Sequence, residues 1–107
     1  MDEKYRNLIE ETLDMFDFHS AEDFFKINDW QYGNENSELY YPDYLDLKRM
    51  CRKLCIDAVN NLIKNKPFPF TTVSSGRFFI LCHFIDDENI NLRVSLEVES
   101  VYSDDYD

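Results

Sequence analysis

The chain of 107 residues is poor in glycine, proline and cysteine, and it has no excess of positive charge. Two glycines and three prolines leave little material for turns, so we expect few loops and no glycine-rich phosphate-binding loop. Three cysteines without a repeating spacing favour reduced thiols in a cytoplasmic protein over a disulfide framework. No charged-then-apolar leader opens the chain, which indicates that there is no secretory signal.

Hydrophobic residues, by contrast, are plentiful. An apolar content of 44%, with nine phenylalanines, seven tyrosines and one tryptophan, supplies enough material for a core. Disorder over the whole chain is therefore not expected. The length suits one domain, 1–107, and no internal repeat divides it. We expect the acidic tail, 103–107, to be frayed.

The net charge of −11 is distributed unevenly along the chain. Residues 1–46 hold thirteen acidic and three basic residues, and residues 78–107 hold eight acidic residues and one basic residue. The middle of the chain, 47–77, holds seven basic residues and one acidic residue. A mostly negative surface repels nucleic acid and anionic membranes and attracts a basic protein. We therefore expect a basic protein surface as partner, with no direct nucleic acid and no membrane.

The longest predicted helix spans 43–65. Pro42 precedes it, Asp43 is a good N-cap residue and Asn65 fits a C-cap. Charges interrupt every turn, so the segment cannot span a membrane. Apolar residues recur along it at helical spacing, namely Leu47, Cys51, Leu54, Cys55, Ala58 and Leu62, widened by Met50, Val59 and Ile63.

Two shorter helices are predicted upstream, over 2–18 and 21–27. Ser20 followed by Asp23 resembles a capping box and is expected to start the second of them. The first has an apolar stripe and, on its other side, an acidic face with few basic residues nearby. That face is expected to be exposed and consists of Glu10, Glu11, Asp14 and Asp17.

The stretch 28–42 has no periodicity and is predicted to be a loop of about fifteen residues, a length that is often functional. It combines aromatic and acidic residues, namely Trp30, Tyr32, Glu35, Glu38, Tyr40 and Tyr41. Aromatic residues are enriched at the centres of protein interfaces, which favours contact with a partner. The alternative, that the rings cap the hydrophobic core, is equally open at this point.

The last third of the chain is strand-like. We expect a short edge strand over 68–73, a turn over 74–76 and a strand buried on both faces over 77–85. After a turn at 86–89, apolar and polar residues alternate over 92–98, which indicates a half-buried strand paired antiparallel with its predecessor. The predicted fold class is α+β, with two or three helices packed on one face of a small antiparallel sheet of two or three strands.

No catalytic or metal-binding pattern stands out. Cys82 and His83 are adjacent on a strand and point to opposite faces, so a metal site formed by them with Cys51 and Cys55 is disfavoured against core packing of the thiols. A Ser–His–carboxylate set built from Ser74 or Ser75 with His83 has no supporting motif. We therefore expect no enzyme activity, no cofactor and no metal.

Tyr40, Tyr41 and Pro42 follow an acidic, polar stretch and resemble the Tyr-Tyr-Pro segment of colicin nuclease immunity proteins. The likeness covers three residues. Those proteins are all-helical, whereas this chain ends in strands, so the likeness indicates a functional class and not a family. The general profile of a small, acidic domain is also similar to that of phage-encoded anti-defence proteins, including anti-CRISPR proteins.

The leading hypothesis is a small acidic inhibitor that occupies the basic groove of a nuclease or another nucleic-acid-binding protein. Carboxylates of the first helix and the loop would stand in for phosphates, and the aromatic residues of the loop would anchor the contact. One alternative is an immunity protein or antitoxin that neutralises a basic toxin enzyme. Another is an assembly subunit that self-associates as a homo-oligomer through its basic helix and acidic ends. In a fourth reading, the charges only solubilise the surface.

Overall fold

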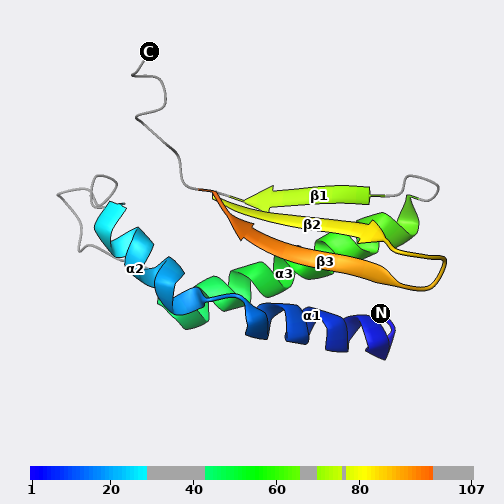
Figure 1. The fold of residues 1–107 in the computed structure, drawn as a ribbon, viewed down its shortest axis with the longest axis horizontal. Coiled ribbons are helices and arrows are strands. Elements are labelled where there is room, and N and C mark those ends of the chain that lie inside the picture. Colours follow the sequence, from blue (N-terminus) through cyan, green and yellow to red (C-terminus); the bar gives the residue numbers. More distant parts are fainter. Residues whose placement is uncertain (29–42, 66–69, 76, 98–107) are drawn as a thin grey trace, which may run out of the picture.

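The computed structural model describes residues 1–28, 43–65, 70–75 and 77–97. Three helices precede a three-stranded antiparallel sheet with strand order β1-β2-β3. The elements are α1 (Glu3–Met15), α2 (Phe18–Asn28), α3 (Tyr44–Lys64), β1 (Phe70–Ser75), β2 (Phe78–Phe84) and β3 (Ile90–Leu96). Helix α3 packs against all three strands, and α1 and α2 pack against α3 (Figure 1). The predicted α+β fold class is confirmed.

Helix α3 has the bounds that its capping residues predict. The Asp43 carboxylate accepts a hydrogen bond of 2.9 Å from the Asp46 backbone N–H, and Asn65 follows the last turn as C-cap. Both ends of the helix are therefore specified locally, by a side chain that satisfies a free N–H group and by a residue that leaves the helical conformation. The predicted stripe is buried, whereas Ile63 at its margin is 38% exposed.

The boundary between α1 and α2 differs from the prediction. Helix α1 ends at Met15 because Phe16 is already extended, with φ −88° and ψ 141°. The Asp17 carboxylate accepts hydrogen bonds from the backbone N–H and the hydroxyl of Ser20, at 3.0 and 2.7 Å. Asp17 is thus the N-cap of α2. The prediction that Ser20 and Asp23 start this helix was wrong by three residues, because the aspartate before them caps it first.

The sheet is a meander of neighbouring strands. Strand β1 pairs with β2 from Phe70 opposite His83 to Ser75 opposite Phe78, so the predicted turn at 74–76 is wrong for its two serines. Strand β3 pairs with β2 and alternates as predicted, although it begins at Ile90, two residues earlier. Expectations for Phe68, Gly76 and the tail lie outside the described residues.

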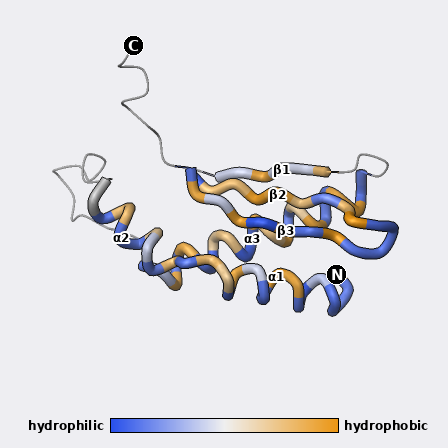
Figure 2. Tube along the Cα trace, in the orientation of Figure 1, coloured by the Kyte–Doolittle hydropathy of each residue, from blue (hydrophilic) through white to orange (hydrophobic). Residues whose placement is uncertain are grey.

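Strand β2 is buried on one face only, which corrects the prediction of two buried faces. Phe78, Ile80 and Cys82 are fully buried against the helices, whereas the alternate residues Phe79 and Leu81 are half-buried on the outer face. The apolar run 77–85 made these two environments look alike in the sequence. Figure 2 shows hydrophobic colouring along most of β2.

An aromatic cluster closes the core where α1, α2 and the sheet meet. The ring of Phe78 lies 6.0 Å from that of Phe16, 6.3 Å from that of Phe18 and 6.0 Å from that of Phe25. Such edge-to-face and tilted contacts add to the gain from burial alone. No helix within the described part of the chain is long and apolar enough to cross a membrane.

Replacing Phe78 by alanine should lower the free energy of unfolding by about 3–5 kcal/mol, because it empties a fully buried site among three other rings. Phe79→Ala is the matched control. It removes the same ring from the next residue, on the half-buried face, and should cost clearly less. Urea melts of both variants measure the difference. Equal losses would mean that both faces of β2 are covered in solution.

Candidate partner-binding surface

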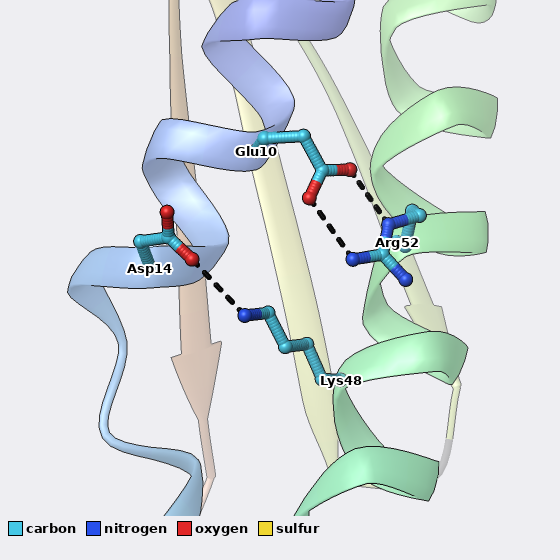
Figure 3. A network of polar contacts seen from close by, with 4 residues as sticks. All are labelled: Glu10, Asp14, Lys48 and Arg52. Atoms are coloured by element: carbon cyan, nitrogen blue, oxygen red, sulfur yellow. Dashed lines mark hydrogen bonds and ion pairs between the residues drawn. The ribbon is translucent and has the colours of Figure 1, made fainter.

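The acidic side of α1 is partly used inside the molecule. The Glu10 carboxylate accepts two hydrogen bonds from the Arg52 guanidinium, at 2.6 and 2.9 Å, and the Asp14 carboxylate pairs with the Lys48 ammonium at 3.0 Å. Figure 3 shows both pairs bridging α1 and α3. Glu10 and Asp14 stand four residues apart, as do Lys48 and Arg52, so each pair of side chains shares one helix face. We call these four residues the interhelix clamp.

The interhelix clamp corrects one premise of the sequence analysis, which placed few basic residues near the acidic face. The hydrogen bonds from Arg52 hold the pKa of the Glu10 carboxyl below its ordinary value of 4.5, and those to Glu10 raise the pKa of Arg52. Both groups are therefore charged at neutral pH. A carboxylate held by an arginine in two places is less available to a partner than a free one.

Asp17, another member of the predicted acidic face, caps the N-terminus of α2. Its hydrogen bonds to the Ser20 side chain and backbone lower the pKa of its carboxyl. The charge lies at the N-terminus of α2, where it is favourable. The structure thus does not bring together the four acids of the predicted face as one free surface.

Glu11 lies on the other flank of α1, away from the interhelix clamp. It lines a cleft of about 290 Å³ between α1 and the β2–β3 connection, which Glu88 also lines. Lys4 is the one basic residue among the described residues that line this cleft. Its ammonium donates a 2.7 Å hydrogen bond to the backbone carbonyl of Glu88, which ties the start of α1 to the connection.

Further carboxylates gather at the same end of the molecule. Figure 1 shows the N-terminal end of α1 beside the β2–β3 connection. The Asp86 carboxylate accepts hydrogen bonds from the side chain and backbone of Asn89, which lower the pKa of its carboxyl and keep it charged. We call this surface the acidic end, and its exposed members are Asp2, Glu3, Glu11, Asp86, Asp87 and Glu88.

Sequence reasoning missed the acidic end because its members are about eighty residues apart in the chain. The run Asp86-Asp87-Glu88 was visible, but it was interpreted only as a turn. The predicted loop residues Trp30, Tyr32, Glu35, Glu38, Tyr40 and Tyr41 lie outside the described residues, so their part in a partner surface stays a prediction.

The three thiols are buried in the core between α3 and β2. Desolvation raises the pKa of Cys51 and of Cys55 to about 12 and that of Cys82 to about 11. All three are therefore protonated at neutral pH, and a thiol is a poor metal ligand and nucleophile. Among the described residues, no group of three or more His, Cys, Asp and Glu side chains is placed to hold a metal ion.

The serine and histidine weighed as a nucleophile pair are also apart. Ser74 lies opposite Phe79, and His83 lies opposite Phe70, at the other end of the β1–β2 pairing. Four residues along a strand correspond to about 13 Å, which is too far for a hydrogen bond between these side chains.

Comparison with known proteins finds no matching family model, no matching curated protein and no matching solved structure.

The first prediction from this surface concerns the interhelix clamp. Glu10→Gln should lower the free energy of unfolding at neutral pH by about 0.5–1 kcal/mol, a small value because solvent screens the pair. Since folding lowers the pKa of Glu10, its contribution is present above the ordinary pKa of 4.5 and is lost as the pH falls through the folded-state pKa.

Glu11→Gln provides the control for the interhelix clamp, because Glu11 has no ion pair with another described residue. It should not lower the free energy of unfolding at any pH, because it removes no ion pair and takes away one of the like charges of the acidic end. Denaturant melts from neutral to acidic pH measure both variants. A Glu10→Gln penalty that persists at low pH would contradict the pairing.

The burial of the three thiols predicts slow reaction with alkylating reagents. Raising a thiol pKa from 9.0 to about 12 lowers its thiolate fraction at neutral pH about a thousandfold, and burial also excludes the reagent. Alkylation of the native protein by iodoacetamide should therefore be very slow, and all three cysteines should react once urea unfolds it. Fast labelling of any one thiol in the native protein, read by mass spectrometry, would show that the core is open there.

Proposed function

We propose that this protein is a small acidic inhibitor that binds the basic groove of a nucleic-acid-handling protein and excludes the nucleic acid. The observation that carries the proposal is the acidic end, where Glu11 of α1 and Glu88 of the β2–β3 connection line one cleft in which Lys4 is the one basic residue among the described lining residues. A groove that binds phosphates offers the complementary charge.

Internal pairing supports this choice of surface. The interhelix clamp neutralises Glu10 and Asp14, and Asp17 caps a helix. The carboxylates of the acidic end are exposed, and neighbouring like charges repel one another. A basic partner relieves that repulsion, so the charge that costs stability in the free protein favours association.

A stable scaffold is part of the proposal. The acidic end stands on the first turns of α1 and on a turn whose residues 86–89 are held by side-chain and backbone hydrogen bonds. Carboxylates mounted on such elements keep their spacing in the free protein. Binding then costs less ordering entropy than it would for a flexible acidic segment.

The test uses a charge-reversed variant, Glu11→Lys with Glu88→Lys, in a pull-down from extract of the source cells followed by mass spectrometry. We expect the wild type to capture a nucleic-acid-binding protein that the reversed variant loses. Added DNA or RNA should compete with the inhibitor for that protein. The association rate should fall as salt rises, because exposed charges steer the encounter over about 10 Å at 0.1 M salt.

The control variant is Asp23→Lys with Asp57→Lys, which changes the net charge by the same amount at exposed positions on α2 and α3. It should retain binding. Equal loss in both variants would show that net charge alone, and not the acidic end, drives association. Capture of a toxin enzyme that binds no nucleic acid would support the immunity-protein alternative instead.

A further inference from the structure

The outer edge of the sheet at β1 is a second surface with a chemistry of its own. Within the described part of the chain, β1 pairs with β2 alone and forms one edge of the sheet (Figure 1). An edge strand leaves backbone N–H and C=O groups pointing outward without a strand to pair with. Another extended strand can form main-chain hydrogen bonds with these groups and so add to the sheet.

Strand β1 itself, Phe70–Ser75, lacks the features of sequence and pairing by which proteins usually block an edge. These features are charged side chains, internal prolines, bulges and very short strands. The sequence of β1, FTTVSS, contains no charge and no proline, and all six residues pair in continuous register with β2. Figure 2 shows no strongly hydrophilic residue along it. The opposite edge, β3, carries the exposed Arg93 and packs against α1.

The charge distribution favours a second copy of this chain as the occupant. Two copies with a net charge of −11 repel each other over most of their surfaces. The stretch 58–85, which includes β1 and β2, contains neither aspartate nor glutamate. Strand β1 is thus an edge where two copies meet without carboxylates opposing one another.

We propose that β1 is a self-association edge, at which two copies pair their β1 strands antiparallel about a twofold axis at Thr72. Residues directly opposite in an antiparallel pair share a face of the sheet. This register sets Thr72 against Thr72 of the second copy and Phe70 against Ser74 of the second copy. The side chain of Phe70, 60% exposed in the single chain, is then covered on the outer face.

The product is one continuous six-stranded sheet with a self-complementary interface, as a twofold dimer requires. Facing threonines are favourable cross-strand neighbours. A strand pair of this length buries less than the roughly 1,200 Å² typical of stable interfaces. The dimer therefore dissociates on dilution. This surface is separate from the acidic end, so the proposal does not depend on the proposed function.

The experiment substitutes Thr72, because at the twofold axis this residue lies opposite the same residue of the second copy. Thr72→Lys and Thr72→Glu each place two like charges opposite each other, at a position that is exposed in the single chain. Sedimentation velocity over a dilution series should show a reversible dimer for the wild type and a monomer for each variant alone. An equimolar mixture of the two variants should restore the dimer, because Lys then faces Glu.

Ser95→Lys is the control, since Ser95 is exposed on the same outer face at the other edge strand. It should dimerise as the wild type does, and urea melts should show that all variants are folded. A wild type that stays monomeric at the highest concentrations would overturn the proposal. It would also be overturned if both Thr72 variants still dimerise, or if their mixture stays monomeric.

Discussion

The fold depends on the burial of one face of α3. This helix lies under all three strands and contacts both other helices, so each remaining element has α3 as a common neighbour. The face is made of small and medium side chains, including Cys51, Cys55 and Ala58, none of which is exposed. Small residues allow the helix and sheet to approach closely, which suits the dense packing of protein interiors.

Charge assists that packing without replacing it. The interhelix clamp sets acids of α1 against bases of α3 where both helices flank the core. Ion pairs that solvent screens contribute little to the free energy of folding, but they fix which sides of the two helices face each other. Because both acids of the clamp lie on α1 and both bases lie on α3, the clamp favours the rotation of α1 that turns its acidic side toward α3.

Internal pairing also sorts the surface into different regions. Glu10 and Asp14 are paired in the interhelix clamp, and Asp17 caps α2. At the acidic end, by contrast, carboxylates from two distant segments of the chain line one cleft. The carboxylate-free stretch 58–85 supplies the sheet. A chain with a strong net charge can therefore present an acidic surface and an uncharged sheet edge at different places.

The sequence alone determined the elements whose causes are local. The Asp43 cap and the apolar spacing predicted α3 almost to the residue, and the alternation after 90 predicted β3. The sequence did not determine the boundary between α1 and α2, because it offers two competing N-caps, Ser20 with Asp23 and Asp17 with Ser20. The chain uses the second cap. With this boundary, the rings of Phe16 and Phe18 both contact the ring of Phe78.

The sequence also could not show which acidic side chains are free of internal pairing. Glu10 and Glu11 are neighbours of the same type, and a rotation of about 100° per residue sends one to Arg52 and the other to the cleft beside Glu88. That difference exists only once α3 and the β2–β3 connection lie on opposite flanks of α1, so the candidate site was decided by tertiary packing.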